Sequence, residues 1–325
     1  MIPPQVRSFA VPADLAGERL DVALARLTGD LSRARVQRLV EAGRVTVSGR
    51  KARASARLRG GEEIRVDVPL PEPDAAVAQD LPLSVLHEDP DLLVLDKAAG
   101  MVVHPARGAP HSTVVNALLF RLRRGADAGP PRLGLVHRLD RDTSGCLAVA
   151  RTEAALASLQ AQFKARTVEK VYVAICHGVP AAGRADTPYG RHPRDRTRFT
   201  GRVRSGRRAV TEWKVLEAFP GAALLEVRLQ TGRTHQIRVH LAEAGHPLLA
   251  DAVYGGRRRE ARLPASAPAR LAAEALGRQA LHASRLSLDH PRSGKRMRFE
   301  APLPADLSRA LALLRAGRVA AGGNR

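Results

Sequence analysis

The sequence predicts an α+β fold divided into a small N-terminal domain and a larger C-terminal domain. Segments with the apolar patterns of strands outnumber the amphipathic helical segments and do not alternate strictly with them, which argues against a doubly wound parallel sheet. Residues 71–82, PEPDAAVAQDLP, are rich in proline and small residues and have no apolar period. This stretch is therefore predicted to be a linker between the two domains.

The N-terminal part has the patterns of two short helices and a hairpin. Residues 1–16 are expected to be a flexible lead-in, and residues 17–70 are expected to form one compact domain. RLDVALARLT and SRARVQRLVEAG have apolar residues at helical spacing; Ser32 is placed to cap the start of the second helix and Gly43 to end it. RVTVSGRKA alternates like a hairpin, and EEIRVDVP predicts one more strand.

Arginines accompany the second predicted helix and the hairpin. Arg33, Arg35 and Arg38 lie largely off the apolar face of the helix, and Arg50 follows the hairpin turn. Such a display suits contact with RNA phosphates, although a solvated basic face on a structural domain is the alternative. The pattern of residues 17–70 resembles the small RNA-binding domain first described in a protein of the small ribosomal subunit, which implies RNA binding and no particular chemistry.

The whole chain carries an excess of basic residues. Lys and Arg total 53 and Asp and Glu total 32, so the formal net charge is +21. A field of this size favours a polyanionic partner, of which nucleic acid is the commonest. Genomic bias could explain the preference for arginine over lysine, but it does not readily explain the excess of bases over acids.

Several other classes of protein are disfavoured. No apolar run approaches the roughly 20 residues that span a bilayer, and the N-terminal segment lacks the apolar core of a secretion signal. A cytoplasmic location with no membrane partner is therefore expected. Cys146 and Cys176 lack the spacing of a zinc site or a disulfide framework, so we expect buried thiols and no metal.

The C-terminal domain is expected to span residues 83–318, with a disordered tail at 319–325. TVVNALLFRLRR, EAALASLQAQFKA, HQIRVHLAEAG and LPADLSRALALLRAG predict helices. Strands are predicted for LSVLHED, LLVLDKA, RLGLVHRLD, CLAVAR, KVYVAICHG, AVTEWKVLEAF and ALLEVRLQT. Residues 256–280 are expected to form an exposed basic insertion.

Charged residues gather at the end of one predicted strand. In GLVHRLDRDTSG, residues 134–145, an apolar strand carries Arg138 and Asp140 into a turn. A rigid strand end is a suitable place for catalytic groups beside a cleft. Residues 142–145 could equally form a simple Asx-type turn. That alternative leaves Arg138 and Asp140 unexplained, because they precede the turn.

A second dense segment, LQTGRTHQIRVHL at residues 229–241, passes from a strand through a turn at Gly232 into a helix. Arg233, next to the turn, is expected to contact phosphate, since guanidinium groups suit that geometry. Arg238 stands inside the helix between apolar residues, and an internal carboxylate is its expected partner.

HRLDRDTSG, KVYVAICHG, LQTGRTHQIRVHLAEAGHPLLADAVYG and ALHASRL follow one another along the chain. Together they resemble the motifs of the RluA family of pseudouridine synthases. VLDKAAGMVVHPARG, STVVNALL and the N-terminal domain resemble the branch that acts on large-subunit ribosomal RNA. The resemblance covers residues 17–305 and implies a mixed, largely antiparallel catalytic sheet. It further implies site-specific isomerisation of uridine to pseudouridine without a cofactor, with large-subunit ribosomal RNA or its precursor particle as partner. We expect a monomer.

The resemblance also implies roles for particular residues. Asp140 matches the family's catalytic aspartate, Tyr172 matches the tyrosine that stacks on the base, and Arg238 matches the arginine that pairs with the aspartate. Arg138, in the same motif as Asp140, is expected to bind RNA. Replacing Arg238 by alanine is expected to harm catalysis far more than folding.

Three features depart from the family pattern: Ala98 replaces the usual proline, HPARGAPHST lacks a glycine common in that loop, and Ala250 replaces the usual glycine. These changes bear on loop stiffness and RNA fit more than on the catalytic group. His137, His235 and His240 are expected to be hydrogen-bonding residues of the cleft wall and not metal ligands.

Two other functions remain compatible with much of this pattern. One is a non-catalytic RNA-binding or ribosome-assembly factor, against which the joint presence of Asp140, Tyr172 and Arg238 argues. The other is a nucleoside hydrolase that releases uracil, which also needs a carboxylate near the sugar. The mass of the RNA separates the three, because hydrolysis alone removes the base and isomerisation leaves the mass unchanged.

Overall fold

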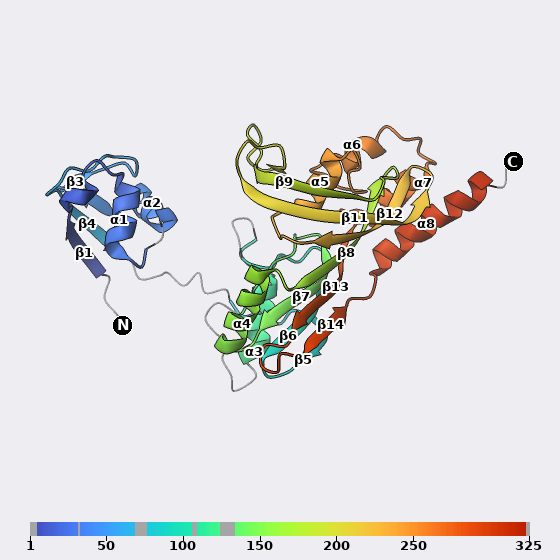
Figure 1. Ribbon diagram of the computed structural model, residues 1–325, viewed down its shortest axis with the longest axis horizontal. Helices are drawn as coiled ribbons and strands as arrows, with labels where there is room; N and C mark the ends of the chain where they lie inside the picture. The colour runs from blue at the N-terminus through green and yellow to red at the C-terminus, as the bar shows by residue number, and fades with distance from the viewer. Residues whose placement is uncertain (1–4, 32, 69–76, 106–108, 124–133, 323–325) are drawn as a thin grey trace. The chain divides into compact units, whose positions relative to one another are not determined.

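The computed structural model describes residues 5–31, 33–68, 77–105, 109–123 and 134–322. It divides the chain into two compact units, Met1–Ala75 and Ala76–Arg325, which are described separately (Figure 1). Both units combine helices with mostly antiparallel sheets, so the predicted α+β class is confirmed. No helix among the described residues is both long enough and apolar enough to cross a membrane.

The first unit packs two helices against a four-stranded sheet with the order β1-β4-β2-β3. The apolar faces of the helices meet the sheet in a core that contains Leu20, Leu24, Val36 and Ile64. Both predicted helices and the hairpin are present, and the predicted N-cap of the second helix, Ser32, lies outside the described residues. The elements are β1 (Gln5–Ala10), α1 (Leu20–Thr28), α2 (Arg33–Glu41), β2 (Val45–Val47), β3 (Arg50–Lys51) and β4 (Glu63–Val68).

The prediction that residues 1–16 form a flexible lead-in is wrong for the described residues from Gln5 onward. β1 pairs antiparallel with β4 along its whole length, from Gln5 opposite Val68 to Ala10 opposite Glu63. β4 would otherwise present a free edge, and β1 satisfies its backbone groups on that side. QVRSFA is too short and too mixed in character to show a strand by alternation alone.

The second unit is built on a ten-stranded mixed sheet with the order β10-β9-β11-β12-β8-β13-β7-β6-β5, and β14 pairs with β13. β13 and β7 run parallel, whereas the other described pairs are antiparallel, as the resemblance implied. The strands are β5 (Ser84–Glu88), β6 (Leu92–Lys97), β7 (Ser144–Ala150), β8 (Glu169–His177), β9 (Gly183–Arg191), β10 (Phe199–Thr200), β11 (Arg207–Phe219), β12 (Ala222–Leu229), β13 (Leu281–Asp289) and β14 (Arg296–Glu300).

Helices cover this sheet at both of its ends (Figure 1). α3 (Val114–Arg123) and α4 (Glu153–Ala165) lie near β6 and β7, whereas α5 (Gln236–Glu243), α6 (Gly256–Glu260) and α7 (Pro268–Leu276) lie near β9 to β12. α5 joins the central core through Ile237 and Leu241. This packing fixes the start of α5 beside the middle of the sheet, where the candidate site lies.

Two predictions for the C-terminal third are corrected. The predicted exposed insertion at 256–280 contains α6 and α7, and α7 buries Ala269, Ala272 and Leu276 against α8 (Ala305–Gly322). Its apolar face is made largely of alanines, so the surrounding arginines obscured it in the sequence. The disordered tail predicted for residues 319–325 is wrong for residues 319–322, because α8 continues to Gly322. Residues 323–325 lie outside the described residues.

The departure at Ala250 has a conformational consequence. Ala250 is buried with a φ of 58°, the left-handed region that glycine adopts without a steric penalty. Ala250→Gly should therefore raise the free energy of unfolding by about 0.5 kcal/mol, because relief of this strain exceeds the added freedom of the unfolded chain. Urea titration measures the change. Ala250→Val, which is β-branched, should be clearly less stable, and a less stable glycine variant would contradict the argument.

Candidate active site

Asp140 stands at the end of an extended segment that runs beside β7. The strand predicted for RLGLVHRLD is wrong over its described part, because Leu135 makes one isolated bridge with Val149 and no ladder follows. Gly134 allows this close approach, since a Cβ there would lie 1.8 Å from the carbonyl oxygen of Ala150. The side chain of Asp140 is 16% exposed.

A buried lysine fixes the turn that follows Asp140. Lys97, at the end of β6, donates from Nζ to the carbonyl oxygens of Ala98 at 2.7 Å, Met101 at 2.9 Å and Arg141 at 3.0 Å. The amide of Gly100 donates to the same Arg141 carbonyl at 2.9 Å. Burial lowers the pKa of Lys97 to about 8, against the opposing charges of nearby carboxylates. The ammonium thus ties the loop after β6 to the turn that carries Asp140.

Arg278 holds the same turn from the other side. It donates to the carbonyl oxygen of Asp142 at 2.9 Å. It also forms a bidentate ion pair with Asp306 of α8, with hydrogen bonds of 2.6 and 3.0 Å. Asp142 itself is 44% exposed on its side chain and lies outside the cavity described below. Two cations therefore set the position of the turn through its backbone.

Arg238 joins Asp140 to a second carboxylate. Its Nη1 lies 3.2 Å from Oδ2 of Asp140, while Nε and Nη2 donate to the two oxygens of Asp251 at 2.7 and 3.0 Å. The ring of Tyr254 lies 5.1 Å from the guanidinium. Burial lowers the pKa of Arg238, but the hydrogen bonds and charges of Asp251 and Asp140 outweigh it and raise the pKa above its ordinary value.

Asp251 is what aims this arginine. Its carboxylate is fully buried and also accepts from the amides of Val253 at 2.9 Å and Tyr254 at 3.0 Å. Burial raises the pKa of Asp251, yet the Arg238 hydrogen bonds and charge prevail and lower it. Because Asp251 fixes two of the guanidinium nitrogens, the third is directed at Asp140.

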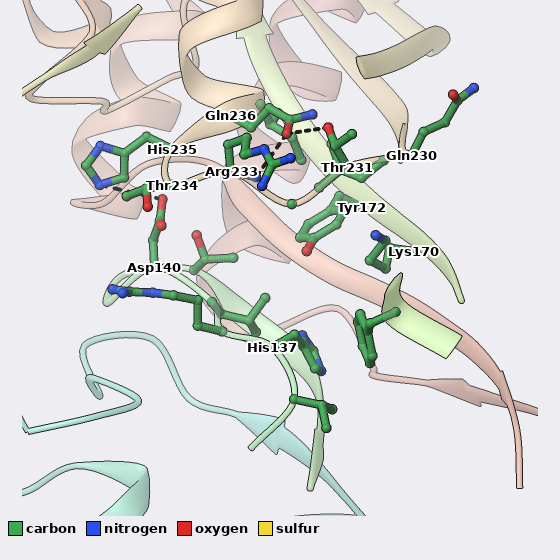
Figure 2. A pocket seen from close by; sticks show the side chains of 18 of the residues that line it. His137, Asp140, Lys170, Tyr172, Gln230, Thr231, Arg233, Thr234, His235 and Gln236 are labelled. Carbon is green, nitrogen blue, oxygen red and sulfur yellow. Dashed lines mark hydrogen bonds and ion pairs between the residues drawn. The ribbon is translucent and has the colours of Figure 1, made fainter. Parts of the chain in front are cut away.

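Asp140 faces a cavity of about 610 Å³ whose wall includes Tyr172 (Figure 2). Tyr172, from β8, is 8% exposed, and burial raises the pKa of its phenol, which is therefore neutral. Leu135, Ile237 and Leu281 supply apolar lining. A flat ring, an apolar wall and one carboxylate suit a planar heterocycle attached to a sugar.

The turn between β12 and α5 forms another wall and is held by Gln236. Its Oε1 accepts from the Thr231 hydroxyl at 2.7 Å and from the Arg233 amide at 3.0 Å (Figure 2). His235, in the left-handed region with a φ of 59°, places Nε2 4.0 Å from Oδ2 of Asp140. Its Nδ1 lies 2.9 Å from the hydroxyl of Tyr254.

The three predicted cleft-wall histidines differ in their positions. His137 and His235 line the cavity, whereas His240 lies outside the lining, in a buried network with Thr211 at 2.8 Å. His137 accepts from the Ala148 amide at 2.9 Å, and burial lowers its pKa to about 3. All three histidines therefore have hydrogen-bonding partners, as expected, but only His137 and His235 lie in the cavity wall.

The predicted RNA-binding arginines fall in both units. Arg138 and Arg233 line the cavity. In the first unit, Arg38 and Arg50 are exposed and Arg35 is partly buried. Arg33 donates from Nε to the buried carboxylate of Asp21 at 2.8 Å, so part of its guanidinium has a structural partner.

Four residues of the site were not given roles from the sequence: Lys97, Asp251, Tyr254 and Arg278. Lys97 follows the apolar run LLVLD, and a lysine at a buried strand end is a signal that could have been used. Asp251 and Tyr254 belong to LLADAVYG, a motif whose role depends on contact with α5. Nothing in the local sequence marks Arg278, because Asp306 and the Asp142 carbonyl, through which it holds the turn, are distant in the chain.

One group of side chains elsewhere has the composition of a metal site. Within the described ranges, ligand atoms of Asp89, Asp91 and His290 lie within 4.8 Å of one another. Asp89 is bound by His87 at 2.6 Å and His290 at 3.0 Å, and Arg292 pairs with Asp91 at 2.6 Å. These protein contacts account for the carboxylates.

The chain resembles known proteins in both sequence and structure. Residues 91–243 match the family model described as RNA pseudouridylate synthase, and residues 18–64 match the S4 domain. Ribosomal large subunit pseudouridine synthase D of Xanthomonas campestris pv. campestris is 46% identical over 313 residues, covering 95% of this chain and 93% of that protein. The protein of the same name from Pseudomonas aeruginosa is 43% identical over 317 residues and covers 97% of each. Human RNA Pseudouridylate Synthase Domain Containing 4 has a TM-score of 0.56 and 29% identity, covering 71% of this chain and 93% of that one.

The boundaries of these matches agree with the division of the chain into two units. One family model falls on each of the two units, and Asp140, Tyr172 and Arg238 all lie inside the larger match. The two bacterial relatives extend over both units. The chain therefore belongs to the RNA pseudouridine synthases, the family that its RluA-type motifs had implied.

Proposed function

We propose that this chain isomerises specific uridines of large-subunit ribosomal RNA to pseudouridine, with Asp140 as the catalytic carboxylate and without a cofactor. The observation that carries the proposal is the placement of Asp140. It faces the cavity beside Tyr172 and is ion-paired to Arg238, whose remaining nitrogens are held by Asp251. The names of the bacterial relatives support ribosomal RNA as the substrate.

The reaction requires a target uridine to leave its stack and enter the cavity, at a cost of a few kcal/mol. Stacking on the ring of Tyr172 would contribute roughly 1–3 kcal/mol toward this cost. Contacts of phosphates with arginines such as Arg138 and Arg233 would contribute the rest.

Inside the cavity, the bond between C1′ and N1 breaks, the uracil turns, and C1′ bonds to C5. The C5 proton is lost and N1 gains a proton, so the product has the composition of the substrate. The Asp140 carboxylate either attacks the sugar as a nucleophile or accepts a sugar proton to assist departure of the base. Arg238 orients the carboxylate for either step, and the apolar wall retains the detached uracil.

The test is incubation of the chain with transcribed large-subunit ribosomal RNA. We expect pseudouridine at defined positions, with unchanged RNA mass and no release of free uracil. Uracil release would indicate a nucleoside hydrolase, and RNA binding without either change would indicate a non-catalytic factor. Mapping pseudouridine in ribosomal RNA from cells that lack the gene would then identify the positions.

The first unit is proposed to dock on the RNA. Deleting residues 1–70 should weaken affinity for ribosomal RNA at least tenfold, because a separate basic surface that includes Arg38 and Arg50 is lost. The second unit has its own core, so its thermal unfolding should persist. Filter binding at several salt concentrations measures the loss, and unchanged affinity would contradict the docking role.

A further inference from the structure

The cavity is lined by cations that the proposed reaction leaves without a defined ligand, apart from the general phosphate contact given to Arg233. Besides Tyr172 and Asp140, its lining includes Arg166, Lys170 and Arg233. In Figure 2 the amine of Lys170 lies on the side of Tyr172 away from Asp140. Among the described residues that line the cavity, Asp140 is the one carboxylate.

Among the described residues, no ion pair joins Arg166, Lys170 or Arg233 to a carboxylate; Lys164 also lines the cavity. The Nζ of Lys170 lies 5.9 Å from the ring centre of Phe163, and Arg233 donates from Nε to the carbonyl oxygen of Arg208 at 3.4 Å. Elsewhere, Arg208 and Arg278 each have a carboxylate oxygen within 2.6 Å. The cations of the cavity lining therefore differ from these two arginines, whose charge is neutralised within the protein.

The positive charges of these side chains also repel one another. Burial and the charge of Arg166 lower the pKa of Lys170 to about 8. Burial and the charges of Arg207 and Arg166 lower the pKa of Arg233. Like charges held together in a partly desolvated place are unfavourable unless an anion joins them.

Arg166 occupies a backbone position that favours another residue. It ends α4 with a φ of 62° and a ψ of 29°, in the left-handed conformation where glycine is most common. An arginine there carries a steric penalty, and retention of a strained residue beside a cavity points to a use for its side chain.

We propose that Lys170, Arg166 and Arg233 form a phosphate subsite that holds a backbone phosphodiester of the RNA next to the flipped uridine. This inference rests on the proposed function. A phosphodiester has two free oxygens, which suit the planar forks of the two arginines and the point charge of the lysine. With the phosphate held by these cations and Asp140 facing the same cavity, the sugar of the target nucleotide is fixed relative to the carboxylate.

Two variants test the subsite on a stem-loop RNA that carries a uridine modified by the wild-type chain. Lys170→Met and Arg166→Gly should each weaken RNA affinity roughly tenfold and reduce the slope of log K against log salt by about 0.7–0.9. Arg166→Gly should keep or raise the melting temperature, because glycine suits the left-handed position. Lys295→Met, an exposed lysine in the turn before β14, is the matched control and should bind like the wild type.

Neutral methylphosphonates identify the phosphate itself. Placed one at a time around the target uridine, one of them should weaken binding by the wild type about tenfold and weaken binding by Lys170→Met clearly less, because only Arg166 and Arg233 remain to contact that phosphate. Equal effects on wild type and variant at every position, or wild-type affinity of both variants, would overturn the subsite. Failure of the proposed function shows differently, as RNA that binds but contains no pseudouridine.

Discussion

Asp140→Asn should abolish pseudouridine formation, lowering the single-turnover rate by roughly 10⁴-fold or more, the range seen when a principal catalytic group is removed. Asparagine keeps the shape of the side chain and an acceptor for Arg238 Nη1, but it loses the charged oxygen that attacks the sugar or accepts its proton. The assay is pseudouridine mapping on ribosomal RNA under single-turnover conditions.

The fold and the RNA affinity of this variant should be nearly unchanged. Asp251 continues to neutralise Arg238 through two hydrogen bonds, at 2.7 and 3.0 Å, and Asp140 is not fully buried. We expect RNA affinity within about twofold of the wild type, since the phosphate contacts are retained. Asp142→Asn is the matched control, with its side chain 44% exposed, and should stay active. Turnover by Asp140→Asn together with loss in Asp142→Asn would transfer the catalytic role to Asp142.

The elements that the sequence predicted well are those with a local pattern. The helix after LQTGRT and the strands β6, β8 and β12 have clear periodicity and appear where the patterns place them. The position of Asp140 and Arg238 as partners came from the resemblance to a family, and the 3.2 Å contact between them joins residues 98 apart. No local sequence pattern could have predicted that these two side chains lie in contact.

The parts that could not be predicted depend on contacts between distant segments. Asp251 lies 13 residues beyond Arg238, and its burial is evident only once α5 packs on the sheet. Lys97 acts on the turn after Asp140 through a carbonyl 44 residues away. The segment before Asp140 resembled a strand because it is apolar, yet its neighbour β7 already pairs with β6 and β13.

The burial of Asp251 also changes the expectation that Arg238→Ala would harm catalysis far more than folding. Without Arg238, a carboxylate with no exposed surface loses its charged partner and keeps two backbone amides. Removal of one member of a buried ion pair typically costs about 3–5 kcal/mol. We therefore expect Arg238→Met, which preserves much of the side-chain length, to lower the free energy of unfolding by roughly that amount and also to abolish activity.

A double-mutant cycle separates the two effects. Asp251→Leu in the Arg238→Met background should recover much of the lost stability, because the uncompensated charge is gone, but it should recover no activity. The pKa of Asp251 is lowered in the folded chain, so the stability that this carboxylate contributes is complete above its ordinary pKa near 4 and declines as the pH falls through the lowered value. The destabilisation caused by Asp251→Asn should accordingly be smaller at pH 3 than at pH 7 in urea titrations. Additive losses in the cycle, or a loss independent of pH, would show that Arg238 and Asp251 do not act as the pair that aims the guanidinium at Asp140.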